Sequence, residues 1–150
     1  MKCNLYCISK ADSVAMIQEY ITKARQFGAN LNVVDIFTPS IAKAQKSSPK
    51  EAQQSYSNAL KGFIKPQSFN IALHPQSQQL DSMGFAKMLE NNAEVNFFIA
   101  GAYGFERDFL QRLKSISLSS LTLSHKVAKI VLCEQIYRAL SIIANHPYHK

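Results

Sequence analysis

Short apolar runs alternate with segments of helical spacing along this chain, and this alternation most constrains its fold. The apolar runs have the length and residue types of strands, and they cover 2–9, 31–37, 69–73 and 95–100. Between them, apolar residues at helical spacing predict helices at about 13–27, 48–62, 78–90, 107–114 and 126–144. Strands that alternate with helices predict an α/β fold in which one domain, residues 1–150, is built on a mostly parallel sheet.

Residues that favour helix ends lie at two of the predicted boundaries. Asp12 or Ser13 is suited to cap the first helix, and Gly28 follows its end. The second helix is expected to begin at Ser47 or Ser48, with a proline in its first turn. The preceding residues, 38–49, are polar and contain two prolines, so we expect a mobile loop there.

The 150 residues are 47% apolar, which allows one hydrophobic core without disulfides. No run approaches the roughly 18 apolar residues of a membrane span, and the N-terminus has no signal-peptide pattern, so we expect a cytoplasmic protein outside the membrane. The three cysteines, Cys3, Cys7 and Cys133, are predicted to be buried reduced thiols, because their number is odd and their spacing matches no zinc site.

Seventeen Lys and Arg residues against ten Asp and Glu residues give the chain a formal net charge of +7. Such an excess favours a polyanionic partner, because each neutralised phosphate releases counterions. The basic residues are spread through the chain and form no tail, which indicates a folded basic face.

Three loops that follow predicted strands are candidate ligand sites, because open parallel sheets bind ligands beyond the carboxyl ends of their strands. They follow Leu73, span 100–105 and span 118–125. The glycines of the second loop, 101 and 104, allow close approach of a ligand, although this spacing is also common in ordinary turns. The chain has neither the glycine spacing of a dinucleotide site nor a Walker lysine. Residues 118–123 fit either a further strand or an irregular loop around a ligand.

One polar line runs along the predicted last helix, which is otherwise apolar around most of its circumference. Glu134, Arg138, Ser141 and Asn145 follow one another at steps of four, three and four. Two interpretations are open: a Glu134–Arg138 ion pair at a solvent edge, or an arginine held beside a phosphate. The wide apolar surface predicts burial against the sheet and against a partner.

The tail after this helix contains His146, Tyr148 and His149, which no helix end requires. Two histidines without a third ligand make a poor metal site, so no metal is expected. A tail that closes over a substrate is the better interpretation. Elsewhere the sequence shows neither a paired-carboxylate nor a Ser-His-Asp arrangement.

Three ordered motifs resemble the RlmH family of SPOUT-class methyltransferases, which modify N3 of a pseudouridine in large-subunit ribosomal RNA. They are SLSSLTLSH at 117–125, VLCEQIYRA at 131–139 and NHPYHK at 145–150. Upstream, FFIAGAYGF at 97–105 is similar to the family's strand and glycine loop, and 69–73 occupies the place of its first cofactor-contacting strand. The resemblance covers the whole chain and is strongest toward the C-terminus.

This resemblance implies a deep trefoil knot over about 69–150 and S-adenosylmethionine as methyl donor. The cofactor contacts carried over are Leu73, Ala100, Gly101, Gly104, Leu118, Ser119, Ser120, Leu121, Thr122 and Leu123. A homodimer is implied, with the last helix in its interface, acting on ribosomal RNA or the assembled ribosome. Catalysis is expected from Arg138, Tyr148 and His149, and substrate binding from His125, Arg138, His146 and Tyr148.

The chain departs from the family pattern in the glycine loop and before the last helix. Ala100 stands where a glycine is common, Ala102-Tyr103 where Pro-Glu is frequent, and Ser124 where a proline is frequent. The alanine methyl is small, so we expect the cofactor to fit. The alternative function is a basic RNA-binding or ribosome-associated protein whose cofactor pocket has decayed. A flavodoxin-like nucleotide-binding enzyme is less well supported, because the phosphate loop is missing.

Overall fold

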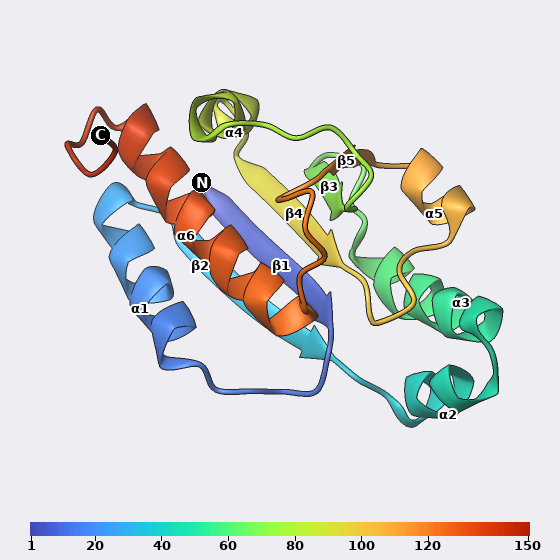
Figure 1. Ribbon diagram of the computed structural model, residues 1–150. Helices are drawn as coiled ribbons and strands as arrows, with labels where there is room; N and C mark the ends of the chain where they lie inside the picture. Colours follow the sequence, from blue (N-terminus) through green and yellow to red (C-terminus); the bar gives the residue numbers. More distant parts are fainter.

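A five-stranded sheet forms the centre of the computed structural model, which describes residues 1–150 (Figure 1). The strands are β1 (Lys2–Ile8), β2 (Asn30–Ile36), β3 (Phe69–Leu73), β4 (Glu94–Ile99) and β5 (Lys114–Ile116), in the order β2-β1-β4-β3-β5. All four strand pairs are parallel, which confirms the predicted α/β architecture. The carboxyl ends of the strands therefore lie at one edge of the sheet.

Helices cover both faces of the sheet, as the continuous apolar character of its central strands requires. One face is covered by α1 (Ala15–Ala24), α4 (Ser82–Leu89) and α6 (His125–Ile143), and the other by α2 (Pro39–Ser47), α3 (Pro49–Leu60) and α5 (Arg107–Gln111). Short 3-10 turns, η1 (Arg25–Phe27) and η2 (Lys61–Phe63), extend α1 and α3. In Figure 1, α6 crosses the sheet from the carboxyl ends of the strands to their amino ends.

The first helix ends as predicted but begins differently. Gly28 has a φ of 68° and terminates the turn after α1. The N-cap is Val14, which has no side-chain hydrogen bond to the helix, so the prediction of a cap at Asp12 or Ser13 was wrong. Asp12 instead forms an ion pair with Lys126 at 2.7 Å, which directs its carboxylate toward α6.

The expected mobile loop at 38–49 is a helix, α2. The Thr38 side chain caps it by accepting from the N–H of Ile41 at 3.2 Å, and Pro39 occupies the first helical position, where a missing N–H costs nothing. Ile41 is buried in the core, which anchors the helix. Ser48 then ends α2 and caps α3, as predicted, by accepting from the Glu51 N–H at 3.1 Å.

A short fifth strand was missed in the sequence. The helix predicted at 107–114 ends at Gln111, and β5 follows it and pairs with β3. Residues 118–123 form no strand, which confirms that this segment is an irregular loop. The three residues of β5 are too few to show an alternation of apolar and polar side chains, so the sequence did not predict this strand.

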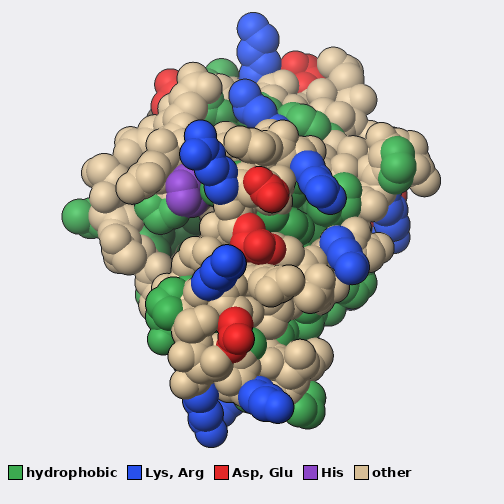
Figure 2. Space-filling view, turned by 90° about the vertical axis from the view of Figure 1, so that its right-hand side faces the viewer, with side chains coloured by type: hydrophobic (Ala, Val, Ile, Leu, Met, Phe, Trp, Pro, Cys, Tyr) green, Lys and Arg blue, Asp and Glu red, His purple; other side chains and the backbone are tan.

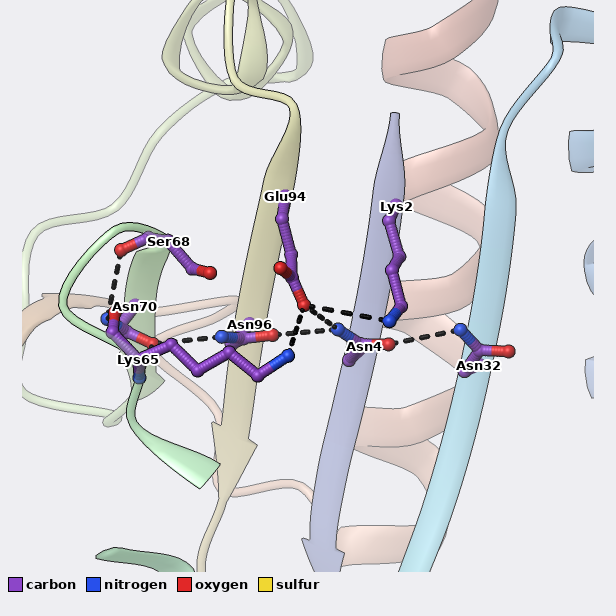
Figure 3. Close-up of polar contacts among 8 residues, drawn as sticks. All are labelled: Lys2, Asn4, Asn32, Lys65, Ser68, Asn70, Glu94 and Asn96. Atoms are coloured by element: carbon purple, nitrogen blue, oxygen red, sulfur yellow. Dashed lines mark hydrogen bonds and ion pairs between the residues drawn. The ribbon is translucent and has the colours of Figure 1, made fainter. Parts of the chain in front are cut away.

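Four asparagines form a row across the sheet at one register position, on the face of α2 and α3 (Figure 3). Asn32 donates to Asn4 at 3.0 Å, Asn4 to Asn96 at 2.8 Å, and Asn96 to Asn70 at 3.0 Å. A slip of one residue would leave buried amides without partners, so the row stabilises this register. Glu94 lies beside it, 2.8 Å from the Lys65 ammonium.

A buried ion pair joins α6 to the carboxyl ends of β1 and β2. The Lys129 ammonium lies 2.7 Å from the Asp35 carboxylate, and the hydroxyl of Ser9 donates to the same carboxylate oxygen at 2.7 Å. The Lys129 side chain is 1% exposed, so its charge is compensated within the protein.

The three cysteines are free and buried, which confirms their prediction as reduced thiols. Burial raises the pKa of Cys3 to about 12, that of Cys7 to about 11 and that of Cys133 to about 12. They are therefore protonated and unreactive at neutral pH.

Candidate functional site

A cavity of about 420 Å³ opens at the carboxyl ends of β3, β4 and β5. The three loops predicted to surround a ligand form its walls, at 73–75, 99–105 and 117–125. Of the ten predicted cofactor contacts, all except Ser120 line the cavity. The structure thus brings together three segments that are far apart in the sequence.

The second loop, at 100–104, is a tight turn. Its main chain closes by a hydrogen bond from the Gly104 N–H to the Gly101 carbonyl at 3.1 Å, and Gly104 has a φ of 73° that favours glycine. Gly101 has no room for a side chain, because a Cβ atom there would lie 2.6 Å from the Tyr56 ring. Ala100 lines the cavity and does not fill it.

The third loop is fixed at its base by hydrogen bonds to the first. His74 donates from its main chain to the Ile116 carbonyl at 2.9 Å, and Ser117 donates to the Gln78 carbonyl at 2.9 Å. Further along, Leu121 is 72% exposed, and the Ser124 side chain caps α6 by accepting from the Val127 N–H at 3.3 Å.

The chemistry of the cavity wall limits the ligands that fit it. Its lining contains no Lys, Arg, Asp or Glu, and half of its residues are hydrophobic. Such a wall, with main-chain N–H and C=O groups between apolar side chains, suits a flat ring and provides no cation for a phosphate. His125, predicted to bind substrate, lies in the lining at the first residue of α6.

A second group of predicted residues meets at the far end of α6. Arg138 donates from Nε and Nη2 to Glu134 Oε1 at 3.0 and 2.7 Å, and the Tyr148 hydroxyl donates to the same oxygen at 3.2 Å. The Arg138 guanidinium lies over the Tyr148 ring at 4.7 Å, and its Nη1 is 3.3 Å from Nδ1 of His149. We call Glu134, Arg138, Tyr148 and His149 the C-terminal cluster.

The cluster is more than a surface ion pair. The Arg138 and Glu134 side chains are only 25% and 20% exposed, and their hydrogen bond raises the pKa of Arg138. Burial, followed by the nearby Glu134 carboxylate, raises the pKa of Tyr148, which therefore keeps its proton at neutral pH. The Glu134–Arg138 ion pair, one of the two interpretations left open by the sequence, is present, and Glu134 also accepts from the Tyr148 hydroxyl, which makes it the shared acceptor that organises the cluster.

His146 is near the cluster without joining its charge network. Asn145 has a φ of 53°, which turns the chain back after α6, and the His146 ring packs edge-on against Phe27 at 5.5 Å. Its Nδ1 accepts from the Tyr148 main-chain N–H at 3.3 Å. These contacts fix the tail in place.

Within one chain, the cavity and the C-terminal cluster lie at opposite ends of α6. Thirteen residues separate His125 from Arg138, which corresponds to about 20 Å of helix. Figure 1 shows the C-terminus beside the amino ends of the strands, whereas the cavity loops lie at the carboxyl ends. The predicted site residues therefore form two groups.

Basic side chains are prominent on the side of the molecule formed by α2, α3 and α5 (Figure 2). The exposed basic residues of these elements and their flanks are Lys43, Lys46, Lys50, Lys61, Arg107, Arg112 and Lys114. Acidic residues, including Glu51 and Asp108, are interspersed among them. The folded basic surface expected from the sequence is thus present, with mixed charge.

Two further properties concern metal ions and membranes. No group of three or more His, Cys, Asp or Glu side chains is arranged to hold a metal ion. None of the helices combines the length and the apolar character that crossing a membrane requires.

Comparison with known proteins places these features in a family. A family model described as "Predicted SPOUT methyltransferase" matches residues 1–149. "Ribosomal RNA large subunit methyltransferase H" of Helicobacter pylori (strain ATCC 700392 / 26695) is 55% identical over 150 residues, and the match covers all of both chains. Proteins with the same name from Helicobacter acinonychis and Helicobacter hepaticus are 54% and 46% identical, again over the full length of both chains.

Proposed function

Because the chain belongs to the SPOUT methyltransferase family, and within it to the RlmH proteins, we propose that it methylates N3 of a pseudouridine in large-subunit ribosomal RNA. It is a methyltransferase that acts on ribosomal RNA. The donor, the target atom and the residues that act on them are the proposed parts. The single observation that carries the proposal of a bound donor is the uncharged cavity enclosed by three loops.

S-adenosylmethionine is the proposed donor, and the cavity fits it. Its nucleoside needs an apolar slot for the ring and main-chain partners for the polar edge of the base, and it has no phosphate that would require a cationic side chain. Leu73, Ala100, Gly101, Gly104 and the 118–123 loop would hold it. When bound, it supplies a methyl group already activated by the positive sulfur.

The residues of the C-terminal cluster are proposed to position the target base. Methyl transfer to N3 forms an N–C bond, breaks the S–C bond and releases the N3 proton. Tyr148 retains its own proton and is a hydrogen-bond donor, so His149 or a water molecule is the better proton acceptor. Arg138, held by Glu134, and His125 would contact a phosphate or a base carbonyl.

A homodimer is proposed because the cavity and the C-terminal cluster lie too far apart within one chain to act on the same reacting atoms. A nucleophile must come within about 3–3.5 Å of the methyl group, whereas Arg138 lies ten residues, about 15 Å along α6, beyond Ala128, the last α6 residue that lines the cavity of the same chain. A second copy packed on α6 would bring its cluster to the first copy's cavity. Val127 on α6 is 44% exposed, and Ile130 and Val131 are partly exposed, as expected of a surface that a partner covers.

The dimer is testable by mixing two inactive variants. Arg138→Ala disables the cluster, and Gly101→Val blocks the cavity loop. If each site uses parts of both chains, heterodimers contain one intact site, and mixing restores part of the activity. No recovery in a mixture that contains verified heterodimers would contradict the shared site.

We also propose that residues 69–150 contain the trefoil knot. The supporting observation is that the segment entering the third loop bonds to both ends of the 74–78 loop, through His74 and Ser117. Threading of the C-terminal segment through a loop held in this way would shape the cavity from three sides.

Ribosomal RNA is the proposed partner, reached in the cytoplasm through the basic surface of α2, α3 and α5. Residues 1–150 are built on one sheet, and the exposed basic side chains of this domain are proposed to supply the contacts with RNA. Methylation should weaken as salt rises, because phosphate contacts release counterions. An activity that is flat across salt would argue against this surface.

The alternative, an RNA-binding protein with a decayed pocket, depends on Ala100 and Tyr103. Ala100 lines an open cavity, and Tyr103 is 42% exposed and outside the lining. Neither side chain occupies the ligand space, so the structure favours the enzyme.

Two experiments test the proposed function. Calorimetric titration with S-adenosylmethionine is expected to give saturable binding, and an absence of binding would support the decayed pocket. Mass spectrometry of ribosomal RNA from a deletion strain is expected to show the loss of one methyl group from a pseudouridine, restored by the intact gene. An unchanged methylation pattern would refute the assigned target.

A further inference from the structure

Tyr56 of α3 contacts the glycine loop without lining the cavity. A Cβ atom at Gly101 would lie 2.6 Å from both Cζ and the hydroxyl oxygen of Tyr56, closer than real Cβ contacts. Tyr56 is fully buried in the core on the face of α2, α3 and α5. The glycine at 101 is therefore needed on the tyrosine side of the loop, whatever a ligand requires on the cavity side.

One hydrogen bond connects α3 to this loop, and a second connects α3 to α2. Gln53, one turn before Tyr56 on α3, donates from Nε2 to the Tyr103 carbonyl at 2.8 Å. The Tyr56 hydroxyl donates to Oε1 of Gln45 on α2. Burial raises the pKa of Tyr56, so its hydroxyl keeps the proton that it donates to Gln45. The loop is thus held from α3, and the tyrosine that holds it is fixed from α2.

We propose that Tyr56 and Gln53 are positioning residues that hold loop 100–104 in the shape that accepts the methyl donor, an inference that rests on the proposed function. The loop has a single main-chain hydrogen bond of its own, from Gly104 to Gly101. Its shape therefore depends on its neighbours. A loop that is already ordered binds more tightly, because binding then costs less conformational entropy.

The test uses two conservative changes and a matched control. Tyr56→Phe removes the hydroxyl and keeps the ring, Gln53→Ala removes the bond to Tyr103, and Gln54→Ala changes the exposed neighbouring residue. We expect Tyr56→Phe and Gln53→Ala each to raise the dissociation constant for S-adenosylmethionine about tenfold, as expected for one lost hydrogen bond. The kcat at saturating donor should be close to that of the wild type, and Gln54→Ala should bind normally.

A second readout needs no ligand. In the ligand-free protein, the amide hydrogen of Gly104 should exchange faster in Tyr56→Phe and Gln53→Ala than in the wild type, because its bond to Gly101 opens more often. Amides of β4 serve as the internal reference and should exchange as before. Faster exchange confined to the loop supports positioning, whereas uniform acceleration indicates general destabilisation and contradicts it.

The contact with Gly101 can be tested by compensation. Gly101→Ala should weaken donor binding strongly, because its Cβ meets the Tyr56 ring. Combining it with Tyr56→Leu removes the obstructing ring atoms and should recover part of the binding. If the double variant binds no better than Gly101→Ala, the contact with Tyr56 is not the reason for the glycine.

The outcomes separate this inference from the proposed function. A wild-type protein that does not bind S-adenosylmethionine overturns both. A wild type that binds, together with Tyr56→Phe and Gln53→Ala variants of unchanged affinity and unchanged Gly104 exchange, overturns the positioning role alone. A lower melting temperature with unchanged affinity also overturns it, since the role would then be only structural.

Discussion

Removing the charge of Asp35 is expected to destabilise the protein more than removing its partner, Lys129. In Asp35→Asn, the Lys129 ammonium, whose side chain is 1% exposed, keeps only neutral partners, the new amide and the Ser9 hydroxyl at 3.5 Å. Without the ammonium, Asp35 is 12% exposed in the present structure and still accepts from Ser9 at 2.7 Å. The charge left behind is therefore better compensated in Lys129→Met than in Asp35→Asn.

The expected losses follow from these surroundings. Breaking a buried ion pair from one side costs about 3–5 kcal/mol of unfolding free energy, and we place Asp35→Asn in this range. Lys129→Met should cost about 1–3 kcal/mol, because Asp35 retains a donor and some contact with solvent. Urea unfolding followed by circular dichroism measures both, and the double variant gives the coupling energy. Lys126→Met on the same helix breaks an exposed pair with Asp12 and should cost about 1 kcal/mol or less.

Equal losses in the two single variants would refute the argument from burial. A loss below about 1 kcal/mol in both would do the same, because it would mean that water compensates both charges. A double variant as unstable as the sum of the singles would show that the two charges do not stabilise each other.

Three other predictions concern the cluster, the basic surface and the thiols. Arg138→Ala should lower methylation at least about 100-fold and leave the donor's dissociation constant unchanged, because Arg138 is proposed to contact the RNA and is not among the residues that line the cavity; assays of both quantities check this, and weakened donor binding would contradict it. Replacing Lys43 and Lys46 together by Gln should raise KM for ribosomal substrate and flatten its salt dependence, measured in a salt series. The unfolding free energy should fall from about pH 9 to pH 11, because the unfolded chain loses thiol protons, ordinary pKa 9.0, that the folded chain keeps. Cys133→Ala should reduce that slope by up to about a third, because the tyrosines whose pKa is raised add to it near pH 10 and above, and an unchanged slope would contradict a contribution from the Cys133 thiol.

Periodicity was sufficient to predict most of the fold. Strands β1 to β4 and helices α1, α3 and α6 were found within a few residues, because their apolar spacing is regular. The helix α2 was missed because Pro39 was interpreted as a break, whereas it occupies the one helical position that tolerates it. Strand β5 depends on pairing with β3 more than on any pattern of its own three residues.

The candidate site was predictable only as far as loops and motifs allow. The loops that form the cavity wall could be predicted, because a parallel sheet brings the loops at the carboxyl ends of its strands together. The contact between Tyr56 and Gly101 was invisible, since it joins residues 45 positions apart through packing alone. The separation of Arg138 from the cavity follows from the direction of α6 across the sheet, which no local signal gives. The ion pair of Glu134 with Arg138 could be suggested from their spacing, whereas the hydrogen bond from the Tyr148 hydroxyl to Glu134 could not.

The asparagine row also limits when this protein can fold. Asn4 on β1 bonds to Asn96 on β4, which is ninety-two residues later in the chain. Ribosomes synthesise protein at about 5–20 residues per second, so β1 waits roughly 5–20 seconds for its central neighbour. Until then, the Asn4 amide has no partner on that side, and the sheet cannot close from its middle. Such long-range pairing slows folding. The sheet of this proposed ribosome-modifying enzyme can therefore be completed only after most of its chain has left the ribosome that synthesises it.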